Sequence, residues 1–303
     1  MLHVVNLREG LPVFKTLASS TRVAILEMLY ARGSMKNMTE IAESLHITSG
    51  ALTPHIKMLA DAGFLTVDFS SGKHGIQRVC NAAEQRVFID PAQAARNINV
   101  YETEVGVGQY SNYEAFPTCG LATPEHVIGA EDDPRYFASP ERVNAGILWL
   151  GHGFLEYLLP NFLKQNQQAI ELQISMELAS EAPGSSDDWP SDITFSLNGV
   201  ALCTWTSPGD FGRVRGIYNP DWWDRNWNQY GLFKLLSVNQ VGTFIDGGKR
   251  SDVTLDDINI QHVKNLVLRI SAPKDTQNAG GLTLYGRHFG NYDQNIRVRM
   301  QYR

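Results

Sequence analysis

The stretch Met38-Thr39-Glu40-Ile41-Ala42-Glu43-Ser44-Leu45-His46-Ile47, continued by Thr48 to Phe64, decides the fold of the first third of the chain. Its apolar residues recur at spacings that give two short helices one apolar face each: Ile41, Leu45, Leu52, Ile56 and Leu59. Thr48 can cap the second helix through its hydroxyl, and Gly63 can end it in a left-handed conformation. Two helices joined by a short turn predict a helix-turn-helix, a motif that binds DNA.

The residues on either side extend this motif. We expect two earlier helices, over Glu9–Leu17 and Thr21–Ala31, the second with an apolar face made of Val23, Ile25, Leu26 and Leu29. After the motif, Leu65–Phe69 and Gln77–Asn81 have the composition of strands, and the polar link between them carries two glycines, which is typical of a hairpin. The whole pattern predicts a winged helix-turn-helix domain over residues 1–90.

Two segments of this domain resemble the ArsR/SmtB-type winged-helix repressors. Leu17–Leu26 is similar to their opening helix, and Thr53–Leu65 is similar to their recognition helix and its exit into the wing. The resemblance covers about the first 90 residues and implies a homodimer that binds a palindromic operator in double-stranded DNA and releases it when an effector binds. Metal-sensing members carry paired cysteines on the helix before the turn. The matching positions here, Asn37–Ile41, have no thiol, so we expect no metal site.

The DNA-contacting residues follow from the helix faces. With the apolar residues turned inward, the outer face of the second helix presents Ser49, Gly50, Thr53, Pro54 and Lys57. Small residues at this end favour a close approach to the major groove; Thr53 is placed for a base edge or a thymine methyl, and Lys57 for a phosphate. Lys73 and His74, at the tip of the wing, are placed for backbone or minor-groove contact. The alternative is a solvated helix face and an ordinary polar turn.

Length, charge and cysteine content bound the remaining possibilities. A chain of 303 residues favours two domains. Residues 1–97 hold 10 Lys/Arg against 8 Asp/Glu, a net charge of +2, whereas residues 98–303 hold 16 against 24, a net charge of −8. DNA contact therefore requires a local basic face in the first third. Three distant cysteines, no apolar stretch long enough for a membrane and no signal-peptide pattern at the start lead us to expect a cytoplasmic protein.

The remaining two thirds have a different pattern. Residues 91–103 are expected to be a linker, with a short helix over Ala92–Ile98. Beyond it, short strand-like runs are bounded by Gly, Pro, Asn and Asp, and Asn198-Gly199 is a strong hairpin signal. The expected strands are Val105–Tyr110, Gly146–Leu150, Phe154–Leu159, Ile170–Leu178, Ile193–Leu197, Val200–Trp205, Gly231–Val238, Leu266–Ala272, Leu282–Tyr285 and Ile296–Tyr302.

Many short strands without helices between them predict an antiparallel, jelly-roll-like β-sandwich over residues 104–303, and so an α+β chain of two domains. At the level of fold this part resembles the galactose-binding-like sandwiches of carbohydrate-binding modules, which implies that it senses a small effector, a sugar. This inference is an analogy of fold alone.

One long polar connection, Thr206–Tyr230, is a candidate ligand site. Connections of this length are typically functional or disordered, and its aromatic residues argue against disorder. Aromatic faces stack on sugar rings, while charged and amide groups bond their hydroxyls. The expected ligand residues are Asp210, Arg213, Tyr218, Trp222 and Trp223, joined by Arg287 from a glycine-rich stretch. The alternative is that the tryptophans only anchor the loop.

The sequence leaves other interpretations of the second domain open. The second domain can be a protein-interaction or dimerisation module that takes no small ligand. It can also be an enzyme that acts on glycans, but such enzymes need two facing carboxylates, and the sequence offers no way to pair them. Cys119, His152 and the acidic run Glu131–Asp133 lie in a loop-rich region without tight ligand spacing, so we interpret them as turns and a buried thiol. We expect no enzyme and no cofactor.

Overall fold

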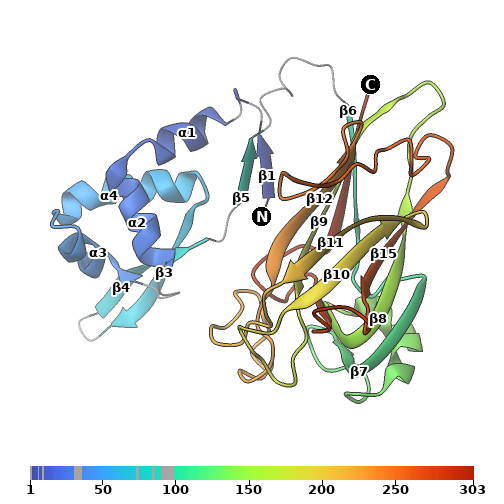
Figure 1. Cartoon of the computed structure of the whole chain (residues 1–303). Helices are drawn as coiled ribbons and strands as arrows, with labels where there is room; N and C mark the ends of the chain where they lie inside the picture. The colour runs from blue at the N-terminus through green and yellow to red at the C-terminus, as the bar shows by residue number, and fades with distance from the viewer. Residues whose placement is uncertain are drawn as a thin grey trace. The chain divides into compact units, whose positions relative to one another are not determined.

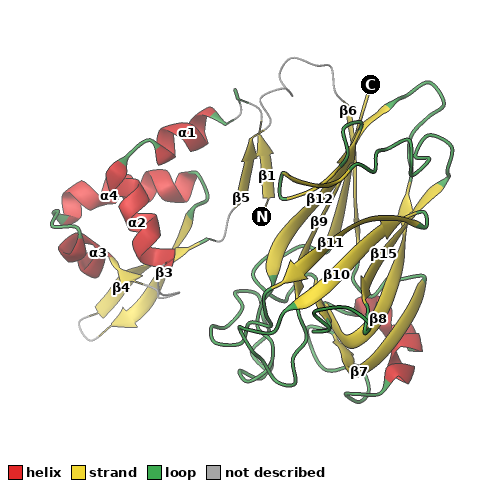
Figure 2. Cartoon of the chain, viewed as in Figure 1, coloured by secondary structure: helices red, strands yellow, loops and turns green. Residues whose placement is uncertain are grey.

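The computed structural model describes residues 2–5, 7, 8, 10–30, 36–72, 75–83, 86–89 and 99–303. They belong to two compact units, residues 1–97 and 98–303. Helices dominate the first unit and strands the second, as Figure 1 and Figure 2 show. In the described part of the chain, no helix is both long enough and apolar enough to span a bilayer.

The first unit has the winged-helix arrangement. Strand β4 lies between β2 and β3 in an antiparallel sheet, and β1 pairs with β5 in parallel. The helices α2, α3 and α4 pack on one another and against this sheet. The elements are β1 Leu2–Val5, α1 Leu11–Leu17, α2 Ser20–Tyr30, β2 Lys36–Asn37, α3 Met38–Ser44, α4 Ser49–Asp61, β3 Leu65–Gly72, β4 Gly75–Ala82 and β5 Arg86–Ile89.

Side-chain caps set the bounds of the helix-turn-helix. Asn37 accepts a bond from the Glu40 amide at 2.9 Å, and the Glu40 carboxylate accepts one from the Asn37 amide at 2.9 Å, so α3 begins with a capping box. The Thr48 hydroxyl accepts from the Ala51 amide at 3.2 Å, and Gly63 has φ of 78° just beyond α4. Both caps predicted from the sequence are therefore confirmed, and they satisfy backbone groups that the helix ends leave unpaired.

Several local predictions for the first unit need adjustment. The first helix begins at Leu11, and Val23, expected in the core, is 37% exposed while Ile25, Leu26 and Leu29 are buried. A proline within the first two turns predicts a helix that starts late or bends there, yet α4 begins at Ser49 and continues through Pro54. The helix expected over Ala92–Ile98 lies outside the described residues.

The second unit is built from twelve strands with two short 3-10 helices, η2 Pro134–Ala138 and η3 Pro140–Asn144. The first strand, β6, starts within the stretch expected to be a linker. The strands are β6 Asn99–Val105, β7 Asn112–Ala122, β8 Ile147–Pro160, β9 Ala169–Ala179, β10 Ser191–Leu197, β11 Val200–Ser207, β12 Leu232–Asn239, β13 Thr243–Ile245, β14 Gly248–Ser251, β15 Asn265–Ala272, β16 Leu282–Tyr285 and β17 Ile296–Tyr302.

All of these strands belong to one large antiparallel sheet that curls toward closure. The order is β11-β10-β15-β8-β16-β9-β12-β13-β14, with β7 beside β8 and β17 between β6 and β9. The short β16 pairs with both β8 and β9, and so joins two groups of strands that would otherwise be separate. Because β11 returns close to β13 and β14, the sheet is nearly a closed barrel around one apolar core. A sandwich of two separate sheets is not confirmed.

The observed strands of the second unit agree with the predicted ones where hydrophobic and polar residues follow a regular pattern. Asn198 and Gly199 have φ of 52° and 80° and join β10 to β11, which confirms the predicted hairpin. The strand expected over Val105–Tyr110 is wrong, because β6 ends at Val105 and a turn follows. The turns expected at Cys119 and His152 are also wrong, since Cys119 lies in β7, whose register shifts between Phe116 and Cys119, and His152 lies in β8. The buried thiol of Cys119 is confirmed. A proline and a glycine inside β7 hide it from a pattern search.

Candidate functional site

The outer face of α4 is a candidate DNA-binding surface. The opposite face, Leu52, Ile56 and Leu59, is buried in the core of the first unit. All five residues that the sequence places on the outer face are exposed: Ser49, Gly50, Thr53, Pro54 and Lys57. The first turn of α4 carries no acidic residue, so the positive end of its dipole is available to an anion, although Thr48 already accepts from the Ala51 amide. Lys73 and His74 lie outside the described residues, and their role stays a prediction.

Two residues of this surface have a local geometry that bears on DNA contact. Glycine inside a helix costs about 0.5–1 kcal/mol relative to alanine. A Cβ at Gly50 would meet only the Thr48 hydroxyl, at 3.9 Å, so internal packing does not require glycine there. The Thr53 hydroxyl donates to the Ser49 carbonyl at 2.9 Å, which leaves its oxygen free to accept and its methyl free for apolar contact. Both features suit a helix end that another surface approaches closely.

The connection from Pro208 to Gly231 is an ordered loop of the second unit. The Arg215 guanidinium donates to the Pro220 carbonyl at 2.6 Å and also to the Trp223 carbonyl. The Asn219 side chain donates to the Gln229 carbonyl at 2.9 Å and accepts from the Gly290 amide at 2.7 Å. These bonds fold the loop on itself and fasten it to the segment after β16.

Trp223 lies at the centre of an aromatic cluster under this loop. It is 2% exposed, and its indole nitrogen donates to the Asn228 carbonyl at 2.8 Å. Four rings surround it with centroid distances of 4.7 to 6.0 Å, in edge-on orientations: Trp149, Trp222, Trp227 and Phe289. Edge-to-face pairs at these distances stabilise beyond the area that they bury. Trp223 therefore anchors the loop.

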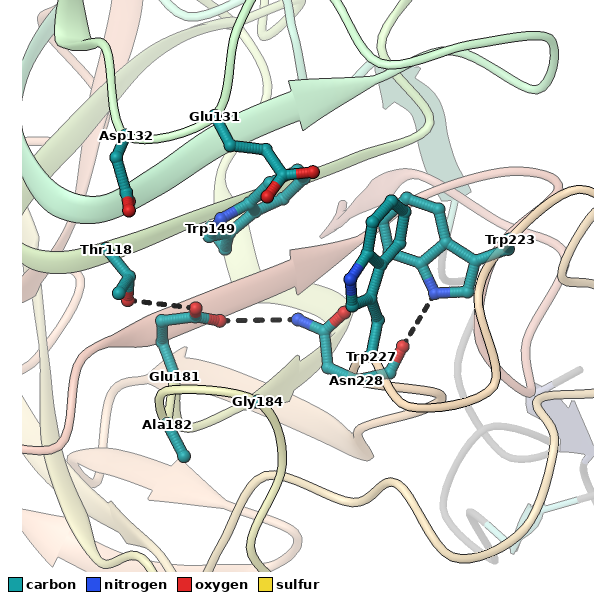
Figure 3. A pocket seen from close by; sticks show the side chains of 10 residues that line it. All are labelled: Thr118, Glu131, Asp132, Trp149, Glu181, Ala182, Gly184, Trp223, Trp227 and Asn228. Atoms are coloured by element: carbon teal, nitrogen blue, oxygen red, sulfur yellow. Dashed lines mark hydrogen bonds between the residues drawn. The ribbon is translucent and has the colours of Figure 1, made fainter.

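A cavity of about 220 Å³ opens beside this cluster, and we call it the Trp149 pocket. Ten residues line it: Thr118, Glu131, Asp132, Trp149, Glu181, Ala182, Gly184, Trp223, Trp227 and Asn228. Figure 3 shows Glu131 and Asp132 on one side of the pocket and Glu181 with Asn228 on the other. The Trp149 ring lies flat against β7 because its partner there is Gly120, where a Cβ would lie 2.3 Å from the indole.

Glu181 is the buried carboxyl group of the pocket, at 8% exposure. Uncharged groups surround its oxygens: Thr118 donates at 3.0 Å, Thr283 at 2.9 Å and the Asn228 amide at 3.3 Å. Burial raises the pKa of Glu181 well above its usual range, and the charges of Asp210 and Asp132 add to the shift, while the threonine hydroxyls oppose it. A carboxyl group in this setting holds a proton more readily than an exposed one.

The structure does not bring together the six ligand residues expected from the sequence. Trp223 lines the Trp149 pocket, but Asp210 is fully buried outside it and accepts a bond from the Ala182 amide. Arg213 is exposed and pairs with Asp187, and Tyr218 is exposed on the loop. Trp222 is 36% exposed and donates to the Pro124 carbonyl. Arg287 pairs with Glu104 beside a different cavity, of about 430 Å³.

Most of the pocket was missed because its residues come from distant segments. Thr118 belongs to β7, Trp149 to β8, Glu181 follows β9, and Asn228 belongs to the long loop. The sequence pattern at Glu131 and Asp132 predicts only a turn. The only local signal was the concentration of tryptophans at 222–227, which correctly marked one wall.

Comparison with known families covers the first unit. The model of the MarR family matches residues 18–68, from the residue after α1 to the middle of β3. MarR is a winged-helix regulator family related to the one that the sequence resembles, so the match supports a DNA-binding winged-helix transcriptional regulator. It does not support the narrower ArsR/SmtB type. No curated protein sequence matches the chain.

Proposed function

We propose that this chain is a transcriptional regulator whose winged helix binds a palindromic operator as a homodimer and whose second unit senses a small carbohydrate. The observation that carries the proposal is the exposed, acid-free N-terminal half of α4, with a glycine that internal packing does not require. The MarR match over residues 18–68 supports the DNA-binding part. The ArsR/SmtB type is the finer part of the proposal and rests on Leu17–Leu26 and Thr53–Leu65.

In this proposal the N-terminal half of α4 enters the major groove. Gly50 and Pro54 allow close approach, and Thr53 contacts a base through its methyl group or as an acceptor, since its proton is already bonded to the Ser49 carbonyl. Lys57 pairs with a phosphate, which fixes the register but carries no sequence information. Local positive groups supply the attraction, because the chain as a whole is acidic.

The Trp149 pocket is the proposed effector site. Trp149 and Trp227 offer aromatic surface for a sugar ring, and the pocket's carboxyl, amide and hydroxyl groups can bond ring hydroxyls. A cavity of about 220 Å³ is smaller than the roughly 300–1,000 Å³ of sites for drug-sized ligands. The proposed ligand is therefore the size of a monosaccharide. The rival hypothesis, an interaction module without a ligand, leaves this cavity without a role.

A second candidate function, glycoside hydrolysis, is favoured by one observation. Carboxyl groups from two separate segments, Glu131 with Asp132 and Glu181, line the same pocket, and hydrolysis of a glycosidic bond uses such a pair. The raised pKa of Glu181 suits a general acid. Release of nitrophenol from a panel of nitrophenyl glycosides by the full chain would support this candidate over the sensor.

Three substitutions on α4 test the DNA-binding surface, with operators selected from a random DNA library and binding followed by fluorescence anisotropy. Gly50→Ala should stabilise the helix by about 0.5–1 kcal/mol and yet weaken operator binding. Thr53→Ala should reduce discrimination between operator and random DNA, with about 1–3 kcal/mol at stake. Lys57→Ala should weaken both kinds of binding and lower the salt dependence.

The control is Asp61→Asn, an exposed position at the far end of α4, which should leave discrimination between operator and random DNA unchanged. Operator binding that is unchanged in all three variants would show that another surface contacts the DNA. Selection of operators without twofold symmetry would contradict the homodimer.

A further inference from the structure

We propose that the Trp149 pocket takes an amino sugar, whose protonated amine is held by the carboxyl groups of Glu131, Asp132 and Glu181 while its ring lies against the tryptophans. This inference rests on the proposed function, because it takes the pocket to be the effector site. The inference specifies that the sugar is positively charged, which the proposed function leaves open.

Two acidic residues on neighbouring segments have cationic partners: Asp133 pairs with Arg135 at 2.5 Å and Asp187 with Arg213 at 2.6 Å. Asp210, whose charge acts on Glu181, is in none of the ion pairs of the described residues. Within the described residues, no ion pair joins Glu131, Asp132 or Glu181 to a lysine, arginine or histidine. The ten lining residues include none of these basic types either. Three acidic groups thus share one small cavity, and none of them is paired with a basic residue in the part of the chain that the structure describes.

A cationic ligand supplies what this arrangement lacks. A buried carboxylate is costly unless it is paired, and neighbouring acidic groups raise the cost. The raised pKa of Glu181, caused by burial and by Asp210 and Asp132, is the physical sign of that cost. A protonated amine in the pocket would favour the ionised form of the buried Glu181 and could pair with the exposed carboxyl groups of Glu131 and Asp132. An anionic ligand would raise it, so acidic and phosphorylated sugars are excluded.

The aromatic walls agree with a cation that is carried on a ring. The faces of tryptophan rings attract cations within about 6 Å, an effect that grows as water is excluded. Trp149, Trp223 and Trp227 all line the cavity, and in Figure 3 the Glu131 side chain reaches toward the region of Trp149 and Trp227. A pyranose with one amine presents a C–H face to an indole and its charge to a carboxylate. Asn228 and Thr118, which donate to Glu181, also line the cavity and add polar groups to its wall.

Matched pairs of sugars test the charge. Glucosamine, galactosamine and mannosamine each differ from glucose, galactose and mannose only by an amine in place of one hydroxyl. Isothermal titration calorimetry on the full chain at neutral pH should show at least one amine that binds about tenfold tighter than its parent hexose, or about 1.4 kcal/mol. Its N-acetyl derivative, which has no charge, should lose that gain. The same titration should change tryptophan fluorescence, since three of the six tryptophans line the pocket.

Parent hexoses that bind as tightly as the amines would overturn the proposal, and so would a lack of binding by all three amines. Equal affinity for tetramethylammonium would overturn the sugar part. The decisive variant is Glu131→Gln. Glu131 is exposed and the substitution removes only its charge, so the affinity for the amino sugar should fall to that for its parent hexose. Asp133→Asn is the matched control in the same loop, because its carboxylate is already paired with Arg135. Equal losses in both variants would mean diffuse attraction, not a site.

The proposed function and this inference can fail separately. If the chain binds its operator but binds no amino sugar, the result supports the proposed regulator and contradicts the amine site in the Trp149 pocket. Amine binding that is abolished by Glu131→Gln but has no effect on operator affinity would support the pocket and contradict its role as the effector site.

Discussion

Replacing Trp223 with alanine should unfold the second unit at a much lower temperature. Its indole is 2% exposed, contacts four other aromatic rings and donates to the Asn228 carbonyl. A buried tryptophan changed to alanine costs about 3–5 kcal/mol, and the unpaired carbonyl can add about 1 kcal/mol. At about 2–4 °C per kcal/mol for a unit of this size, the melting temperature should fall by about 10 °C or more.

The assay can follow each unit by itself. All six tryptophans lie between Trp149 and Trp227, so tryptophan fluorescence reports the second unit. The α-helices of the described residues lie in the first unit, so circular dichroism at the helical band reports that unit. We expect Trp223→Ala to shift the fluorescence transition and to leave the helical transition and operator affinity nearly unchanged.

Trp222→Ala is the matched control, with the same chemical change one residue away. Trp222 is 36% exposed and its main polar contact is to the Pro124 carbonyl, so its loss should lower the melting temperature by less than half as much. A fluorescence transition of Trp223→Ala within a few degrees of the parent chain would refute the anchoring role. Equal shifts in the two variants would show that burial does not separate these neighbours.

Two further predictions concern a buried carboxyl group and a helix end. Burial raises the pKa of Asp210 to about 7, above 3.8 in the unfolded chain, so its contribution to stability is full below about pH 4 and is lost as the pH rises through 7. Asp210→Asn should therefore stabilise the chain at pH 8 by up to about 4 kcal/mol. The melting temperature of this variant should also fall less between pH 5 and 8 than that of the parent chain. An unchanged dependence of the melting temperature on pH would contradict this prediction. Gly63 has φ of 78°, so Gly63→Ala should lower the free energy of unfolding of the first unit by about 1–2 kcal/mol, as followed by its helical signal. The change is opposite in sign to that of Gly50→Ala. An unchanged free energy of unfolding would mean that the left-handed position does not require glycine.

The sequence alone determined the elements whose signals are local. The apolar period over residues 38–64 needs only neighbours three and four positions apart, so it predicted α3, α4 and the outer face of α4. The residue types of Thr48 and Gly63 predicted the two ends of α4, whereas the capping box of Asn37 on α3 was not predicted. Asn198-Gly199 predicted its hairpin for the same reason, because the two residues themselves favour the positive φ that the turn requires. In these cases the residues that determine the element lie within a few positions of one another in the sequence.

Only the tertiary structure decided which side chains share the Trp149 pocket. Strand pairing joins residues far apart in the chain, so nothing local to Glu131 or Glu181 shows that they line one cavity. The same holds for β16, which pairs with β8 and β9 and makes one sheet where the pattern suggested two. Trp222 and Trp223 are identical and adjacent, yet Trp222 is 36% exposed and Trp223 is buried. Their difference depends on which rings and carbonyls the folded loop brings to each of them, and that is a property of packing between distant segments.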